Sequence, residues 1–147
     1  MPQAFAINIL AWGMLEFKEG YQIAQEWDTA LNIVKWGLDW LKNCHYQSDT
    51  LVGQVGITSN EYSFWGRPED MDMTRPVFEI NPENPGSDLA GQVAATFASG
   101  AVLFKDTDSE YAEDLLQRAV ELHDFAVDHQ GKYSDAIPER VLQLHIF

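Results

Sequence analysis

An apolar stripe with helical spacing is the strongest constraint on the fold of this chain of 147 residues. The stripe advances by four and three residues in turn and so lies on one face of a helix: Trp27, Leu31, Val34, Leu38 and Leu41. Trp36 and Trp40 add a neighbouring row, so this helix is apolar on more than one side. We therefore expect it to lie between other helices, with Trp27, Trp36 and Trp40 in the core.

Two more helices are predicted, one before this stripe in the sequence and one later in the chain. The first runs from about Gln3 to Phe17, and Gly20 is expected to end it. Ser87 offers an N-cap to the third, "DLAGQVAATFASGAVLF". This third segment carries a row of small residues, which lets another helix approach closely: Ala90, Ala94, Ala98 and Ala101.

A fourth helix begins after a capping-box pattern. Thr107 and Glu110 form the T-x-x-E motif, and Gly131 ends the apolar periodicity that follows. Short connections join the first helix to the second and the third to the fourth. The sequence therefore predicts an all-α fold class, with two antiparallel helical hairpins and a long loop insertion between them.

The insertion, residues 47–88, breaks the helical pattern with repeated Gly and Pro. Within it, "LVGQVG" and "PVFEI" are candidate short strands. Its aromatic and apolar residues argue against disorder. A connection of this length inside a compact domain is typical of a functional loop.

The formal net charge of -14 makes nucleic acid and anionic membranes improbable partners, because both would be repelled. The single Cys44 excludes an internal disulfide and a thiolate metal cluster. No apolar run approaches the length of a membrane span, and the N-terminus lacks signal-peptide features. If Met1 is the natural start, the expected location is the cytoplasm.

Several motifs, in this order and spacing, resemble the catalytic domain of glycoside hydrolase family nine. They are "AFAINILAWGMLEF", "GQVG", "FWGRPEDMDMTRP", "NPGSDLAGQVAATFASGAVLFK" and "GKYSDAIP". The resemblance covers residues 2–138 and implies an (α/α)6 toroid, of which the two hairpins form an incomplete part. It therefore implies a partial catalytic domain at 1–138, followed by a divergent tail at 139–147 that matches nothing expected.

The family contains endo-β-1,4-glucanases, so the resemblance implies hydrolysis of internal β-1,4-glucosidic bonds in cellulose or a related β-glucan, without a cofactor. The implied mechanism is inverting, with one carboxylate activating water and a distant carboxylic acid protonating the leaving oxygen. The matching segments for this base and acid lie outside residues 1–147, so we expect the chain alone to be inactive. The parent family implies an extracellular location and packing against the remainder of the catalytic domain. The alternative is a non-catalytic truncated paralogue that binds carbohydrate weakly or serves as a helical interaction module.

The stretch "YSFWGRPEDM" supplies the candidate substrate-binding residues, Tyr62, Phe64 and Trp65. Flat aromatic rings complement the apolar faces of glucosyl units. The alternative is that the rings only pin the loop onto the helices; we favour sugar contact for Trp65 and leave Phe64 open between the two. Tyr62 stands where the family commonly has a histidine, and it can hydrogen-bond but not carry positive charge.

The charged residues of this stretch allow two interpretations. Arg67 and Asp70 could hydrogen-bond sugar hydroxyls, but we favour an internal ion pair that holds the loop in shape, and we assign the same structuring role to Arg75. A catalytic pair formed from the three loop carboxylates is disfavoured, because they are expected to be solvated or paired with arginine: Glu69, Asp70 and Asp72. The histidines lack metal-ligand spacing, so no metal is expected: His45, His123, His129 and His145.

Overall fold

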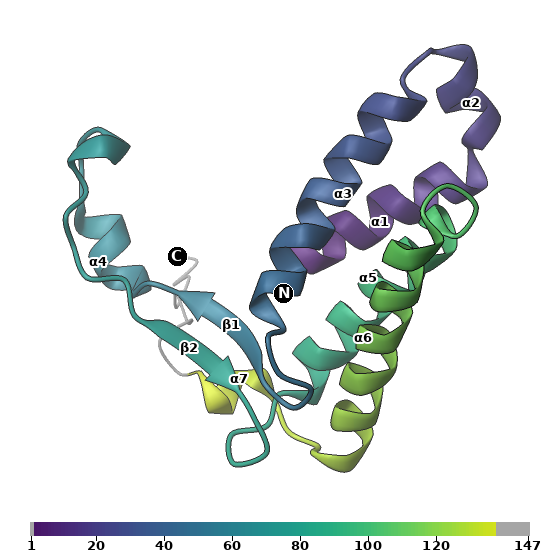
Figure 1. The fold of residues 1–147 in the computed structure, drawn as a ribbon. Helices are drawn as coiled ribbons and strands as arrows, with labels where there is room; N and C mark the ends of the chain where they lie inside the picture. Colours follow the sequence, from purple (N-terminus) through teal and green to yellow (C-terminus); the bar gives the residue numbers. More distant parts are fainter. Residues whose placement is uncertain (1, 138–147) are drawn as a thin grey trace, which may run out of the picture.

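The helices of the structure follow the apolar rows of the sequence (Figure 1). The computed structural model describes residues 2–137. Its long helices are α1 (Pro2–Glu16), α3 (Trp27–Cys44), α5 (Ser87–Phe104) and α6 (Ser109–Asp128). Its short helices are α2 (Lys18–Ile23), α4 (Thr58–Ser63), α7 (Tyr133–Ala136) and the 3-10 turn η1 (Pro68–Asp70). The two predicted strands are confirmed as β1 (Leu51–Val55) and β2 (Val77–Ile80).

The helical body, formed by α1, α3, α5 and α6, contains most of the core. Helix α5 lies against α6 along its length and also packs on α1 and α3. Phe97 of α5, Leu38 of α3 and Leu115 of α6 are each 0% exposed. Full burial of such a side chain stabilises a fold by roughly 1.5–3 kcal/mol. The predicted all-α class is thus confirmed for the described residues, with the small sheet confined to the insertion.

Small residues on α5 bring the helices of the body close together. A Cβ atom at Gly100 would lie 2.7 Å from Leu38 Cδ1, so a larger residue there would require the Leu38 side chain to move. Ala90, Ala94 and Ala101 are buried as the small row predicted. Ala98 of the same row is half-buried.

Polar side chains join the helices where they cross. Thr96 Oγ1 on α5 donates a hydrogen bond to the Ala4 carbonyl of α1, with an O–O distance of 3.0 Å. The Tyr111 hydroxyl on α6 donates to Asp39 Oδ1 on α3 at 2.8 Å. Such bonds fix the relative positions of helices that apolar packing alone would hold less specifically.

Both predicted N-caps are wrong by one residue. Gly86 occupies the cap position of α5, while the Ser87 hydroxyl donates to the Gly131 carbonyl at 3.1 Å. Asp108 caps α6, because its Oδ1 accepts from the Tyr111 amide at 3.2 Å. An ionised carboxylate is the stronger acceptor at the positive end of a helix dipole, so Asp108 prevails over the neighbouring threonine.

The predictions for Gly20 and for two tryptophans are also wrong. Helix α1 ends at Glu16, and Gly20 lies inside α2 rather than ending the first helix. Trp36 is 74% exposed and Trp40 is 42% exposed, whereas both were predicted to be in the core. Trp27 is half-buried, with its ring 6.5 Å from that of Tyr21. Within residues 2–137, no helix covers the outer face of α3 on which Trp36 lies.

Candidate aromatic arm and the family of the chain

The insertion folds into a two-stranded sheet with a projecting arm, residues 56–76, which joins the two strands (Figure 1). Strands β1 and β2 are antiparallel, with Leu51 opposite Ile80 and Val55 opposite Val77. Leu51 and Ile80 are buried at the body end of the sheet. The sheet therefore anchors the arm to the body, while the arm itself extends away from it.

The three candidate aromatic residues lie on the arm, with different environments. Trp65 is 99% exposed and Tyr62, on α4, is 72% exposed. Phe64 is half-buried, with its ring against Gly66. Because its indole is almost fully exposed, Trp65 does not pin the arm onto the helices. Phe64 packs within the arm, and sugar contact by Tyr62, Phe64 and Trp65 stays a prediction.

The charged residues of the arm form two separate ion pairs. Arg67 Nε lies 3.1 Å from Asp70 Oδ2, and both side chains are exposed. Arg75 Nη2 lies 2.8 Å from Glu61 Oε1, which links the base of the arm to α4. Neither pair is a carboxylate dyad of the kind that general acid–base catalysis needs.

A cavity of about 420 Å³ lies at the junction of the sheet with the helical body. Gln3 of α1, Gln54 of β1 and Arg75 contribute hydrogen-bonding groups to its lining, and Trp40 contributes an indole. Amide and guanidinium donors beside an aromatic face suit a hydroxyl-rich ligand. No local sequence pattern relates Gln3, Trp40 and Gln54 to one site, because they come from three separate segments.

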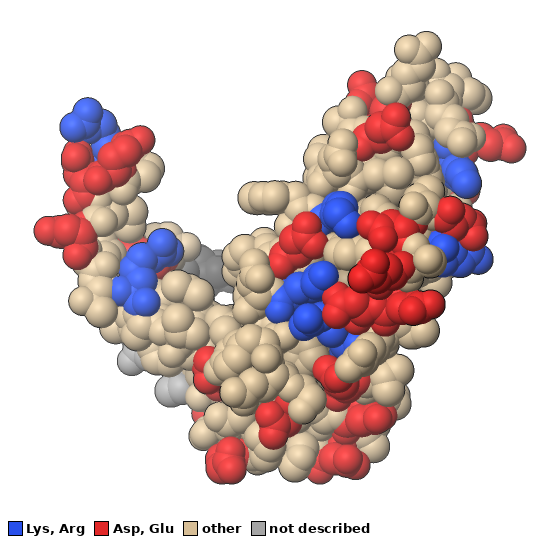
Figure 2. All heavy atoms as spheres, in the orientation of Figure 1, with Lys and Arg blue, Asp and Glu red and all other residues tan. Residues whose placement is uncertain are grey.

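Figure 2 shows an open hollow between the arm and the helical body, with charged side chains at the end of the arm, beside its base and over the body. An uncharged ligand would enter such a hollow without the repulsion that the net charge of -14 would impose on an anion.

The junction of α3 with α6 contains a polar cluster around the buried His45. His45 is 1% exposed, and its Nε2 lies 3.5 Å from the Ser48 carbonyl oxygen. Burial lowers the pKa of His45, although Ser48 and Glu121 oppose this effect. Arg118 donates to the His45 carbonyl at 2.6 Å and pairs with Asp114 at 3.0 Å. These contacts make His45 part of the connection between α3 and α6, rather than a metal ligand.

In the described part of the chain, the other titratable groups do not assemble a metal site. Within residues 2–137, no group of three or more His, Cys, Asp or Glu residues lies close enough to hold a metal ion. His123 is exposed beside Asp124, and the His129 ring lies 5.2 Å from that of Phe125. The predicted tail at 139–147, with His145, lies outside the described residues. None of the described helices is long and apolar enough to cross a membrane.

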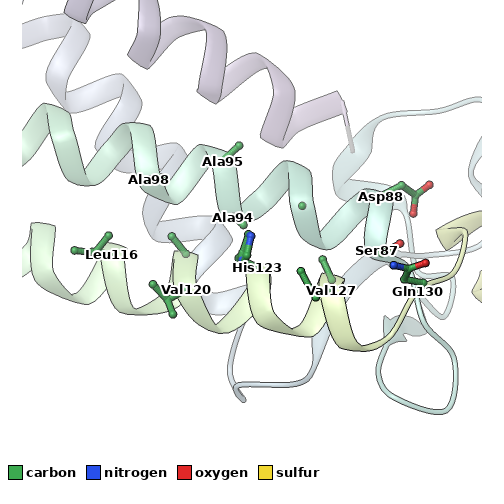
Figure 3. A pocket seen from close by; sticks show the side chains of 13 residues that line it. Ser87, Asp88, Ala94, Ala95, Ala98, Leu116, Val120, His123, Val127 and Gln130 are labelled. Atoms are coloured by element: carbon green, nitrogen blue, oxygen red, sulfur yellow. The ribbon is translucent and has the colours of Figure 1, made fainter.

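A second hollow, of about 690 Å³, follows the outer face of the α5–α6 hairpin (Figure 3). Small side chains of α5 lie across from branched apolar side chains of α6 (Figure 3): Ala94, Ala95, Ala98, Leu116, Val120 and Val127. A neighbouring hollow continues it past Ala98 and Leu116. This face has the small-residue surface on which another helix could pack closely.

The fold consists of paired helices around a common core, with an aromatic arm that extends from a small sheet. This arrangement assigns the chain to the all-α class, as a segment of an (α/α)6 toroid. The endoglucanase of the termite Nasutitermes takasagoensis, whose structure was solved at pH 2.5, superposes with a TM-score of 0.90 and 42% identity. The match covers 92% of this chain and 31% of the termite chain. A C. cellulolyticum cellulase in complex with cellobiose superposes with a TM-score of 0.85 and 30% identity, over 89% of this chain and 31% of that one.

Sequence comparison gives the family. The model of glycosyl hydrolase family 9 matches residues 1–143, and the chain belongs to this family. Endoglucanase 15 of Arabidopsis thaliana is 39% identical over 93% of this chain and 28% of its own length. Endoglucanase A of Bacillus pumilus is 37% identical over 93% of this chain and 21% of its own length. The chain therefore spans less than a third of each of these relatives.

Proposed function

We propose that residues 2–137 form one side of the substrate cleft of an endo-acting β-1,4-glucanase. The complete catalytic domain would hydrolyse internal β-1,4-glucosidic bonds of cellulose or a related β-glucan, outside the cell. The observation that carries this proposal is the 99% exposure of Trp65 on an arm that the sheet anchors to the body. A flat indole that is exposed on a projecting arm is accessible to a sugar ring and offers it a stacking surface.

The chemistry of the arm suits a neutral sugar polymer. The C–H faces of β-linked glucosyl units are apolar, and Trp65 offers a flat ring of matching character. The Tyr62 hydroxyl, also on the arm, can donate to and accept from sugar hydroxyls. Gln54 and Arg75 line the cavity at the base of the arm, where they could orient a sugar unit. Binding would thus combine stacking with directed hydrogen bonds.

The bond-breaking groups would come from other parts of the domain. We infer an inverting mechanism, in which a base activates water and a separate acid protonates the leaving oxygen. Residues 2–137 would contribute substrate binding and orientation rather than proton transfer, so the chain alone would not turn over glucan. The rest of the domain would cover the hollow along α5 and α6, and the exposed face of α3 that carries Trp36.

A chimera tests this function directly. Residues 2–137 would replace the matching segment of the termite endoglucanase, which has 42% identity to this chain and a TM-score of 0.90. We expect the chimera to release reducing ends from carboxymethyl cellulose, while the isolated chain releases none. A chimera that folds cooperatively, binds no cello-oligosaccharide and has no activity would overturn the proposal.

A further inference from the structure

The arm carrying Trp65 is joined to the rest of the molecule through a narrow base. Helix α4 and turn η1 make few contacts with the other described helices and strands, and Figure 1 shows the arm pointing away from the helical body. The direction of the arm is therefore determined by the contacts at its base. These contacts are formed by residues 54–61 on one side and 75–76 on the other.

A charged pair closes the base of the arm. Arg75 Nε donates to Glu61 Oε1 at 2.9 Å, and Arg75 Nη2 lies 2.8 Å from the same oxygen. Glu61 immediately precedes Tyr62 on α4, and Arg75 precedes the residue that leads into β2. The pair therefore joins the helix carrying Tyr62 to the strand that returns to the body. Two guanidinium nitrogens on one oxygen restrict the pair more than a single contact would.

The backbone beside this pair is shaped to accept it. Gly56 has a φ of +84°, in the region that favours glycine, and its amide donates to the Pro76 carbonyl at 2.8 Å. A Cβ atom at Gly56 would overlap Glu61 Oε1, so the missing side chain makes the space that the carboxylate fills. Gln54 Nε2 in turn donates to the Gly56 carbonyl at 2.9 Å. The base of the arm thus combines the Glu61–Arg75 pair with hydrogen bonds of the Gly56 backbone.

We propose that the Glu61–Arg75 pair is a positioning contact that sets the direction of the arm and presents Trp65 and Tyr62 to the glucan. The inference that this pair affects glucan binding rests on the proposed function. The inference that it sets the direction of the arm does not. Arg75 also lines the cavity at the sheet–body junction, so the same pair couples the direction of the arm to that cavity. The Arg67–Asp70 pair lies wholly within residues 67–70 and cannot set this direction.

Distance measurements on the chain itself test the first part. Spin labels would be attached at Asn60→Cys on α4 and Gln117→Cys on α6, two exposed positions. Burial raises the pKa of the native Cys44 thiol to about 11, so this thiol stays protonated at pH 7 and reacts slowly with the label. We expect a narrow distance distribution in the parent protein and a distribution about twofold wider in Glu61→Gln, because the base then opens locally.

Two variants complete this test. Asp70→Asn removes an ion pair of the same kind elsewhere on the arm and should leave the distribution unchanged. The double variant Glu61→Gln with Arg75→Gln should give a distribution no wider than Glu61→Gln alone, because both residues act through one contact. Equal widths in the parent and in Glu61→Gln would overturn the proposal, and so would a double variant that is wider than the single one.

Binding of cellohexaose to the termite chimera tests the second part. We expect Glu61→Gln to weaken binding about threefold, as suits a half-exposed pair. If Trp65→Ala weakens binding while Glu61→Gln does not, the positioning inference fails and the proposed function stands. If Trp65→Ala leaves binding unchanged, the proposed function fails, and the distance distributions still decide the direction of the arm.

Discussion

The helical body and the arm use aromatic residues in opposite ways. In the body, Phe97 is 0% exposed and is surrounded by side chains from neighbouring helices. On the arm, Trp65 is 99% exposed and Tyr62 is 72% exposed. A buried ring stabilises the fold, whereas an exposed ring on the arm is available to a ligand.

The two regions also differ in what holds them together. The body is held by apolar packing between long helices, with a few hydrogen bonds such as that between Thr96 and Ala4. The arm is held by the sheet and by ion pairs such as Glu61–Arg75. Substitutions in the body should therefore change stability, and substitutions on the arm should change binding. Each prediction below tests one side of this contrast.

The largest effect is expected in the body, from Phe97→Ala. Loss of this buried ring should lower the free energy of unfolding by about 3–5 kcal/mol, because a cavity replaces close-packed contacts. Urea unfolding followed by circular dichroism measures it. Trp65→Ala is the matched control and should stay within about 0.5 kcal/mol of the parent. Equal losses from the two substitutions would remove the contrast between the regions.

The arm should show the reverse pattern in binding. In the termite chimera, Trp65→Ala should weaken cellohexaose binding about tenfold, equivalent to about 1.4 kcal/mol, because a stacking surface is lost. Trp65→Phe keeps a flat ring and should retain most of the affinity. Calorimetric titration measures both variants. Equal weakening by the two would show that ring stacking is not what Trp65 contributes.

A smaller effect on stability is expected at the start of α6. Asp108→Ala should lower the free energy of unfolding by about 1 kcal/mol, because the Tyr111 amide loses its acceptor. Asp106→Ala removes an exposed carboxylate just before the cap and should have almost no effect. Urea unfolding compares the two variants. A loss at Asp106 as large as that at Asp108 would contradict the cap assignment.

The smallest effect concerns pH and the buried His45. Burial lowers the pKa of His45 below its ordinary value of 6.5, so the unfolded chain takes up the proton first as pH falls. The contribution of neutral His45 to stability should be complete above pH 6.5 and be lost as pH drops toward the folded-state pKa. His45→Gln should reduce the fall in stability between pH 7.5 and 5.5. If stability fell by the same amount between pH 7.5 and 5.5 in His45→Gln as in the parent, His45 would be excluded as the source of this fall.

The long helices could be predicted because their periodicity is local. The stripe from Trp27 to Leu41 predicts α3, and the Gly and Pro residues of 47–88 predict a break with two short strands. The N-caps were wrong because nearby acceptors compete: Asp108 stands beside Thr107, and Ser87 bonds to Gly131. These competitors depend on geometry that a sequence motif does not encode.

The environment of single aromatic residues was harder to predict. Periodicity places Trp36 and Trp40 on an apolar face of α3 but cannot show whether another helix covers that face. Both side chains are exposed in the structure. On the arm, composition placed Trp65 in a functional loop but could not give its exposure. The cavity lined by Gln3 and Gln54 was missed because only the folded chain brings these residues together.

The central claim is that the arm meets the glucan through Trp65. Fluorine NMR of the chain labelled with 5-fluorotryptophan compares Trp65 with Trp36, which is 74% exposed on α3. On titration with cellohexaose, the account predicts a saturable shift of the Trp65 resonance and a stationary Trp36 resonance, each assigned by its Phe variant. A stationary Trp65 resonance, or equal shifts of both, would contradict the account.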